Sequence, residues 1–204
     1  MGKQVWKPGT MVSPVPPVMV SCGSLEKPNI LTIAWTGIVN TIPAMAYISV
    51  RPQRFSYPLI KESREFVINL TTRALTWAAD YCGVKSGADT DKFSVCKLTP
   101  APASQVGAPL IKESPVNIEC RVKQVIPLGS HDMFLAEIVA VNVDEVLVDQ
   151  NGKLHLDQSG LVAYSHGEYF ALGEKLGSFG YSVRKKPKNN PASRKKRLGK
   201  RKRA

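Results

Sequence analysis

Residues 29–56 read NILTIAWTGIVNTIPAMAYISVRPQRFS, and the rest of the chain is organised around this stretch. The alternation in residues 30–35 predicts a strand that carries the small side chains of Thr32 and Ala34 on one face. A face built of small side chains lets a flat ring approach the backbone closely. Residues 44–51 predict a second strand. The stretch therefore predicts two strands joined by a turn, with a helix starting behind them.

Polar side chains gather at the end of the second predicted strand. Ser49 and Arg51 share one face there, and Pro52 ends the strand because it has no N–H to donate. Arg54 and Ser56 fall in the first turn of the predicted helix. Hydroxyls, guanidinium groups and a helix N-terminus together suit an oxyanion such as phosphate. An ordinary strand end with a solvated Arg51 fits the residues equally well, so both interpretations stay open.

The remaining pattern favours strands over helices. Helices are predicted at 54–63 and 73–82, the second ending at Gly83, and residues 84–108 read as a long loop. Because strands follow one another directly, the pattern predicts an antiparallel barrel with accessory helices and not a doubly wound sheet. The other predicted strands are 18–22, 66–70, 117–126, 131–141, 143–149 and 162–170, the last being either a strand or an irregular segment.

The net charge of +12 is concentrated at the end of the chain. Twelve of the 28 basic residues lie from Arg184 onward, where no acidic residue occurs, and the remaining 16 balance the 16 acids. We therefore expect a folded domain at 1–183 and a disordered basic tail at 184–204. Clustered Lys and Arg can bind nucleic acid or acidic lipid, and the tail is the one part of the chain that predicts this.

Cysteine usage and hydropathy exclude several classes of protein. The four cysteines show no CxxC and no Cys/His pairing, which argues against structural zinc and against a disulfide framework. No apolar run approaches the ~20 residues of a membrane span, and the first residues lack the apolar core of a signal peptide. We therefore expect a soluble cytoplasmic protein with free thiols, no metal and no membrane contact.

Six motifs resemble the flavin reductase-like family of FMN-binding split-barrel proteins, most closely its flavoredoxin branch. The resemblance extends over almost the whole chain except the last twenty residues. This resemblance implies a Greek-key split β-barrel, bound FMN, NADH or NADPH as reductant, and a homodimer with the flavin near the subunit interface. The motifs are TIAWTG at 32–37, ISVRPQRFS at 48–56, EFVINL at 65–70, DKF at 91–93, GSHDMFLAEI at 129–138 and a final one at 172–185.

The resemblance also implies the residues of the cofactor site. Ser49, Arg51 and Ser56 would lie near the phosphate and ribityl chain, and residues 32–37 would contact the ring. The segment at 86–93 would close over the flavin, although a lone Lys92 is equally a surface charge, and Cys82 reads more as packed than as reactive. The expected cofactor contacts are Asn29, Thr32, Ala34, Trp35, Thr36, Gly37, Ser49, Val50, Arg51, Ser56, Asn69, Cys82, Ser86, Lys92 and Phe93.

His131 is the candidate catalytic residue. Similar reductases carry a Gly-x-His here, close to the nicotinamide site, and the alternative is a strand-end histidine bonded to backbone. His155 and His166 read as solvated or packed. No GxSxG nucleophile elbow occurs, so a hydrolase triad lacks support. Asp132 and Glu137 fall on opposite faces of one predicted strand, which argues against a paired acid and base.

The resemblance implies hydride transfer from NAD(P)H to flavin, and then electrons to free flavin, ferric iron or another acceptor. A second hypothesis is an FMN electron-transfer protein that a protein partner reduces. A third is a nucleic-acid-binding protein that works through its basic tail, with the barrel as scaffold. Aromatic area for a dimer interface could come from Trp35, Trp77, Phe134 and Tyr164, which otherwise belong to the core.

Overall fold

The computed structural model describes residues 1–184, and the basic tail predicted at 184–204 falls outside this range except for its first residue. The chain divides into two compact units, Met1–Leu172 and the part from Gly173 onward. The second unit contributes one described element, the short 3-10 helix η4 at Tyr181–Val183. All other elements belong to the first unit.

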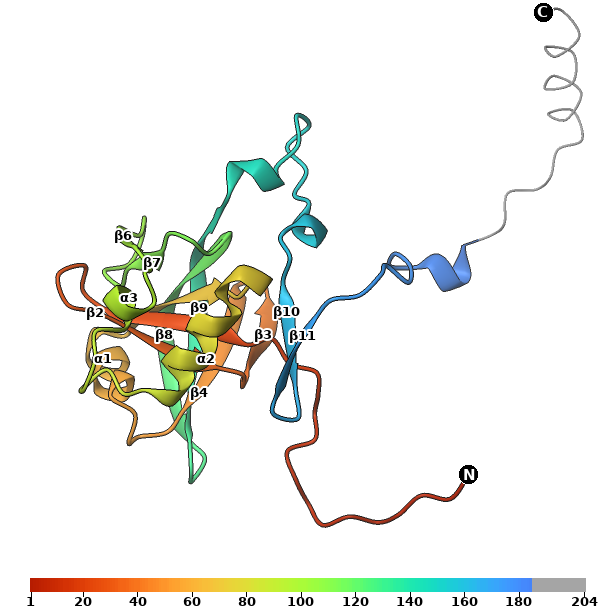
Figure 1. Ribbon diagram of the computed structural model, residues 1–204, viewed down its shortest axis with the longest axis horizontal. Coiled ribbons are helices and arrows are strands. Elements are labelled where there is room, and N and C mark those ends of the chain that lie inside the picture. Colours follow the sequence, from red (N-terminus) through yellow and green to blue (C-terminus); the bar gives the residue numbers. More distant parts are fainter. Residues whose placement is uncertain (185–204) are drawn as a thin grey trace, which may run out of the picture. The chain divides into compact units, whose positions relative to one another are not determined.

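Seven strands form one antiparallel sheet with the order β2-β1-β5-β8-β9-β4-β3 (Figure 1). This confirms the prediction of a mainly β, antiparallel fold. The strands are β1 (Val18–Gly23), β2 (Pro28–Ile33), β3 (Thr36–Thr41), β4 (Ala44–Val50), β5 (Glu65–Leu70), β8 (Val116–Pro127) and β9 (Asp132–Val143).

The two outermost strands of this sheet are consecutive in the chain. β2 and β3 lie at opposite edges of the sheet, yet only Ala34 and Trp35 separate them. The three steps from Ile33 to Thr36 span at most about 11 Å. The sheet therefore has to curl until its edges meet, which makes it a barrel with a seam at Ala34 and Trp35. Immediately beyond this seam, the Ser49 amide donates to the Trp35 carbonyl at 3.0 Å.

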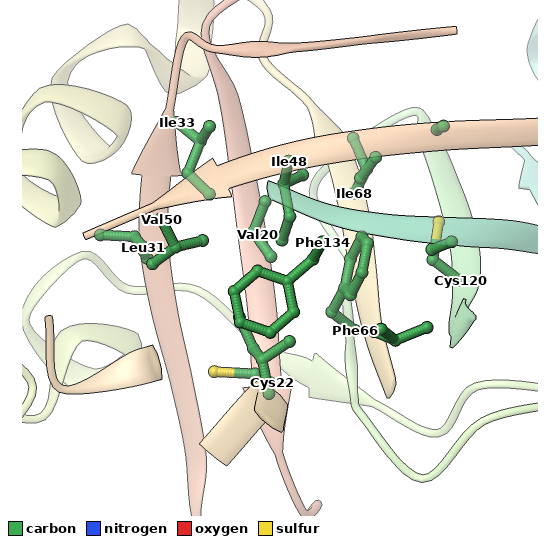
Figure 2. Close-up of a cluster of buried hydrophobic side chains, with 14 of the residues drawn as sticks. Val20, Cys22, Leu31, Ile33, Ile48, Val50, Phe66, Ile68, Cys120 and Phe134 are labelled. Carbon is green, nitrogen blue, oxygen red and sulfur yellow. The ribbon is translucent and has the colours of Figure 1, made fainter. Parts of the chain in front are cut away.

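The inside of the curled sheet holds the main core (Figure 2). Phe66 and Phe134 are fully buried there and are among the largest buried side chains. Alternate residues of each strand point inward, as the period of two requires. Leu31 and Ile33 from one edge strand share this core with Ile48 and Val50 of β4, so burial of apolar area holds the curled edges together.

The elements η1 (Arg73–Leu75), α2 (Thr76–Val84) and α3 (Lys92–Val95) cover the other face of β1 and β2, and Figure 1 shows α2 and α3 near β2. The helix α1 (Ser56–Ser63) instead packs Ile60 into the main core. Met19 and Ile30 point outward from the barrel and pack with Ala79 and Phe93 in a second core. This helical layer places the end of α2 and the start of α1 beside the barrel seam.

Three predictions of local structure were wrong. The turn predicted between the first two strands contains β3, which pairs with β4 as a hairpin. The strand predicted at 143–149 does not exist, because β9 ends at Val143 and the 3-10 helix η2 (Glu145–Leu147) follows. The helix predicted to stop at Gly83 continues to Val84. Gly83 does not adopt the left-handed conformation that ends a helix, and a glycine is needed there because α2 packs closely on Thr32 of β2.

Smaller elements complete the first unit. The predicted loop at 84–108 contains α3 and the short strand β6 (Pro100–Ala101), which pairs with β7 (Leu110–Ile111). Residues 162–170 form the hairpin of β10 (Val162–Ser165) and β11 (Glu168–Ala171). His166 and Gly167 both have positive φ at its tip, as a tight hairpin turn requires. A 3-10 helix, η3 (Leu156–Gln158), precedes this hairpin.

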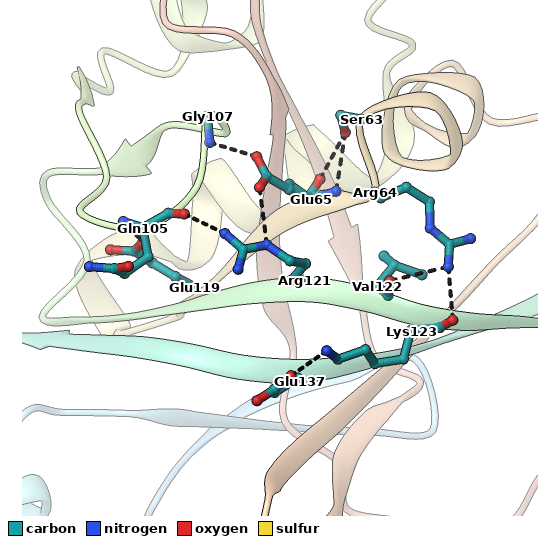
Figure 3. A network of polar contacts seen from close by, with 10 residues as sticks. All are labelled: Ser63, Arg64, Glu65, Gln105, Gly107, Glu119, Arg121, Val122, Lys123 and Glu137. Atoms are coloured by element: carbon teal, nitrogen blue, oxygen red, sulfur yellow. Dashed lines mark hydrogen bonds and ion pairs between the residues drawn. The ribbon is translucent and has the colours of Figure 1, made fainter.

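A polar network fastens the loop at 103–108 to the outside of the barrel (Figure 3). The Glu119 side chain has no exposed surface and accepts hydrogen bonds from the amide and hydroxyl of Ser104, the amide of Gln105 and the amide group of Asn142. Glu65 accepts from the Gly107 amide at 2.7 Å. These donors compensate the cost of burying the Glu119 carboxylate, and they hold its pKa below the ordinary value although burial acts in the opposite direction.

Candidate functional site: a cleft at the barrel seam

A cleft of about 670 Å³ opens at the barrel seam. Its floor consists of the end of β2 with Ala34 and Trp35, the end of β4 at 49–51, and His131. The carboxyl end of α2 forms one wall. The extended segment at 10–17 and the tip of the β10–β11 hairpin form the other. The size lies within the usual range of small-molecule and cofactor sites.

A second hollow of about 110 Å³ adjoins this cleft. Leu31 and Arg54 line both spaces, which places this hollow directly beside the cleft. The small hollow is bordered by the start of α1 and by the segment at 85–92. It carries the cations Arg54, Lys85 and Lys92 and the hydroxyls of Ser56 and Ser86, and no carboxylate is among the lining residues that the structure describes. We call it the basic pocket.

Lys92 is an unusual cation because its side chain is buried. Its Nζ donates to the carbonyl oxygens of Ile30 at 2.8 Å and Cys82 at 2.9 Å, and only 4% of the residue is exposed. Burial lowers the pKa of this amine, since the charged form loses hydration. As an ammonium group it has three N–H donors, so one remains beyond the two carbonyls. Lys92 therefore fixes β2, α2 and α3 to one another and borders the basic pocket.

Asn29, Ser56 and Gly87 shape the opposite side of the basic pocket. Asn29 Nδ2 donates to Ser56 Oγ at 2.6 Å, which leaves the hydroxyl hydrogen of Ser56 to point elsewhere. A Cβ atom on Gly87 would overlap Asn29 Oδ1 and would lie 2.8 Å from the Phe55 ring. Only glycine therefore lets the 85–92 segment lie this close to the start of α1.

Thr32 and Gly83 bring α2 close to β2 at the cleft. Thr32 Oγ1 donates to the Ala79 carbonyl oxygen, and a Cβ on Gly83 would stand 3.3 Å from Thr32 Cβ. Arg54 Nη1 donates to the Gly83 carbonyl at 3.2 Å and thereby interacts with the negative end of the α2 dipole. The Thr32 hydroxyl is thus committed to the helix, whereas four of the five N–H donors of Arg54 stay available.

His131 and Trp35 form an aromatic pair on the cleft floor. Their ring centroids are 4.5 Å apart with the planes tilted by 50°, and Ser130 Oγ lies 3.0 Å from His131 Nδ1. Burial lowers the pKa of His131, and the positive charges of Arg51 and Arg54 lower it further. The imidazole is therefore neutral at neutral pH, with one nitrogen that donates and one that accepts.

The structure brings most of the expected cofactor residues to these two spaces and leaves others out. Asn69 instead joins a buried network with Ser21, Ile111 and Asn117. The side chains of Cys82 and Phe93 lie in the second core. Thr36 and Gly37 do not line either space. The cleft is lined by Thr32, Ala34, Trp35, Ser49, Val50, Arg51 and His131, the basic pocket by Ser56, Ser86 and Lys92, and Asn29 contacts the latter through Ser56 and Gly87.

Lys85 was not predicted for the site. Arg54 was predicted beside a spot suited to an oxyanion, but not among the cofactor contacts. Nothing in the local sequence marks Lys85, which only follows a helix end. The far wall of the cleft was missed as well: Tyr169 donates its hydroxyl to Asp80 at 3.3 Å, and burial followed by the Asp80 charge raises the Tyr169 pKa to about 12. Of the four aromatic residues suggested for a dimer interface, Phe134 is fully buried in the barrel and does not reach the surface.

Two negative findings apply to residues 1–184. Within this range no cluster of three or more His, Cys, Asp or Glu side chains is arranged to hold a metal ion. The helices in the same range are too short or too polar to cross a membrane.

Comparisons with known proteins agree with this geometry. Residues 11–173 match the family model described as flavin reductase like domain. The structure resembles flavoredoxin of Desulfovibrio vulgaris (Miyazaki F) with a TM-score of 0.83 and 32% sequence identity, covering 90% of this chain and 100% of that one. An uncharacterized protein of Archaeoglobus fulgidus is 32% identical over 72% of this chain and 81% of its own. An NADPH-flavin oxidoreductase of Streptomyces viridifaciens is 25% identical over 69% of this chain and 74% of its own. The chain therefore belongs to the flavin reductase-like family, on its flavoredoxin branch.

Proposed function

We propose that this chain is an FMN-dependent oxidoreductase that takes hydride from NADH or NADPH and passes electrons to a small-molecule acceptor. The observation that carries the proposal is the junction of two unlike spaces at the barrel seam. One is a wide cleft over small and aromatic side chains, and the other is a narrow pocket lined by three cations. A phosphorylated planar ligand needs both in this arrangement.

The phosphate end fits the basic pocket. Arg54, Lys85 and the remaining N–H of Lys92 supply cationic donors, and Ser56 and Ser86 supply hydroxyls. Gly87 keeps the pocket narrow because any side chain there would collide with Asn29 and Phe55. This assignment places the phosphate with Arg54 and Lys85, and it leaves Ser49 and Arg51 beside the ring.

The ring end fits the floor of the cleft. When bound there, FMN supplies the group that accepts hydride and releases electrons. Ala34 and Thr32, whose hydroxyl is bonded to α2, are small enough to let a flat ring approach the strand backbone. Trp35 and His131 would border this ring. Arg51 can place positive charge beside the pyrimidine edge, where negative charge develops on reduction. The neutral His131 can accept a proton at one ring nitrogen, which gives it a positive charge, and can donate a hydrogen bond from the other.

Two relatives support different electron donors. The relation to an NADPH-flavin oxidoreductase supports reduction by a nicotinamide, and the volume of the cleft leaves room for a second flat ring between the floor and the wall at 10–17. The likeness to a flavoredoxin supports a second candidate function, in which a protein partner reduces the bound FMN. Both candidates need the same FMN site and differ only in the reductant.

Anaerobic mixing tests the proposal. The purified chain is loaded with FMN, freed of excess ligand and mixed with NADH or NADPH while flavin absorbance near 450 nm is followed. Rapid bleaching by one nicotinamide, at a rate that saturates with its concentration, supports the oxidoreductase. Bound FMN that nicotinamides leave oxidised, and that dithionite bleaches, supports the electron-transfer protein. Failure to retain FMN at all contradicts both candidates.

A further inference from the structure

Two thiols meet behind the basic pocket. Cys82 on α2 and Cys96, which follows α3, have sulfur atoms 3.8 Å apart, and both are free thiols. Cys96 lies fourteen positions after Cys82 in sequence, without any motif that pairs them. Cys82 is fully buried, whereas Cys96 is partly exposed. The remaining cysteines, Cys22 and Cys120, are buried at other places in the fold.

We propose that Cys82 and Cys96 are a redox-active pair that forms a reversible disulfide, and that this bond restrains the segment lining the basic pocket. The segment between the two cysteines carries Lys85, Ser86, Gly87 and Lys92, which are all pocket residues. A bond between its ends therefore closes a loop that contains a large part of the pocket.

The geometry permits closure by a small movement of α3. A disulfide needs an S–S distance of about 2.05 Å, so the sulfur atoms have to approach by about 1.8 Å from their present 3.8 Å. Cys82 is held in the second core, while Cys96 follows the end of the four-residue helix α3, where it is partly exposed. Lys92 already ties the start of α3 to the Cys82 carbonyl at 2.9 Å, one helical turn before Cys96. Closure thus strengthens a contact that exists in the reduced protein.

The oxidant we name is a low-molecular-weight disulfide. The Cys96 thiolate attacks one of its sulfur atoms, forms a mixed disulfide and releases one thiolate. Cys82 then loses its proton to solvent, attacks the Cys96 sulfur and releases the second thiolate. The protein gives up two electrons and two protons, and the small disulfide is reduced to two thiols.

Burial makes this exchange slow and dependent on pH. It raises the pKa of both thiols, that of Cys82 to about 12, and Lys92 offsets part of this effect. Cys96 is the more accessible of the two and begins the reaction. Since only the thiolate attacks, the rate should rise with pH up to the pKa of Cys96. In the second step the attacking sulfur needs no diffusion, because its target is already in contact.

Alkylation and mass spectrometry test the disulfide directly. The full chain is incubated in glutathione buffers from reducing to oxidising and then unfolded in denaturant, so that all remaining free thiols, including the buried ones, are alkylated. We expect two fewer alkylated cysteines in the oxidising buffers, a cross-linked peptide containing Cys82 and Cys96, and full reversal by dithiothreitol. The Cys96→Ser variant should lose the cross-link and Cys120→Ala should keep it. Four alkylated cysteines throughout, or only glutathione adducts, would overturn the proposal.

A second measurement tests the link to the pocket, and it rests on the proposed function. FMN release is followed by fluorescence from the oxidised and reduced wild-type chain. We expect several-fold slower release from the oxidised chain, and no effect of oxidation on release from Cys96→Ser. Equal release rates from a cross-linked and a reduced chain would refute the restraint on the pocket. A chain that binds no FMN would refute the proposed function. The alkylation experiment would still show whether Cys82 and Cys96 form a disulfide.

Discussion

Replacing Arg54 by alanine should weaken FMN binding by weakening the hold on its phosphate. A charge-assisted hydrogen bond contributes about 1.5–3 kcal/mol. Arg54 is exposed, so solvent screening favours the lower end of this range. About 1.5 kcal/mol corresponds to a roughly tenfold higher Kd. The lost bond to the Gly83 carbonyl is also exposed, and the fold should therefore lose little stability.

Riboflavin separates the phosphate from the ring, because it has the same ring system without phosphate. Titration of the apoprotein with both ligands gives the ratio of their affinities. We expect Arg54→Ala to lower the preference for FMN over riboflavin about tenfold, in line with the energy above. Arg51→Ala should weaken both ligands by the same factor, since Arg51 lines only the larger cleft. Arg73→Ala, outside both spaces, serves as the matched control.

The assignment of the phosphate to Arg54 would be refuted if Arg51→Ala, and not Arg54→Ala, lost FMN selectively. A selective loss of FMN in Arg51→Ala, with an unchanged ratio in Arg54→Ala, would move the phosphate to the end of β4. Equal losses for FMN and riboflavin in Arg54→Ala would show that the arginine acts on the ring or on the fold. Thermal unfolding of each apoprotein distinguishes these two cases.

Three further predictions follow from contacts around the site. Glu119→Gln should lower the free energy of unfolding by about 1.5–3 kcal/mol at neutral pH. Backbone amides donate to both oxygens of the buried carboxylate, and the N–H₂ group of glutamine would place a second donor against one of these amides. Because the pKa of Glu119 is lower in the folded than in the unfolded state, the carboxylate stabilises the fold above the unfolded pKa, and this stabilisation is lost as pH falls through the folded pKa. The free energies of unfolding of the two proteins, measured in urea, should therefore converge in acid, and a difference that stays constant with pH would contradict this. An NMR titration of His131 should give a midpoint below about 6.5, and Arg51→Ala should raise it; no rise would mean that the charge of Arg51 does not contribute to the lowered pKa. Gly87→Ala should displace the 85–92 segment and lower the FMN-to-riboflavin preference, whereas Ala88→Gly should not; wild-type preference in Gly87→Ala would show that the pocket tolerates a Cβ.

The sequence predicted the architecture well because strand formation depends on local alternation. Short apolar runs mark β1 and β5, and alternating residues mark β8 and β9, within one or two residues of their observed bounds. The same reasoning failed at β3, whose residues 36–41 combine Thr, Gly and Asn with exposed apolar side chains and therefore resemble a turn. It also failed at 143–149, where an apolar run without a sheet neighbour forms a 3-10 helix.

Half of the candidate site could be predicted in the same way. Trp35, Ser49, Arg51 and Ser56 come from one continuous stretch, and a strand end followed by a helix start brings them together locally. The proposed division of these residues into a ring end and a phosphate end could not be predicted from the sequence. It depends on Lys85, which reaches the pocket from the far end of α2.

By itself, the sequence determined that the chain forms an antiparallel barrel and that hydroxyls and arginines collect at the end of one strand. These features follow from the spacing of neighbouring residues. Only the tertiary structure decided that Arg54 meets Lys85 across a pocket that Gly87 keeps narrow, and that Cys82 touches Cys96 behind it. Such contacts arise because two edge strands joined by two residues force the sheet to close, and because the helices pack on its outer face. Packing of that kind leaves no periodic trace in the residues it brings together.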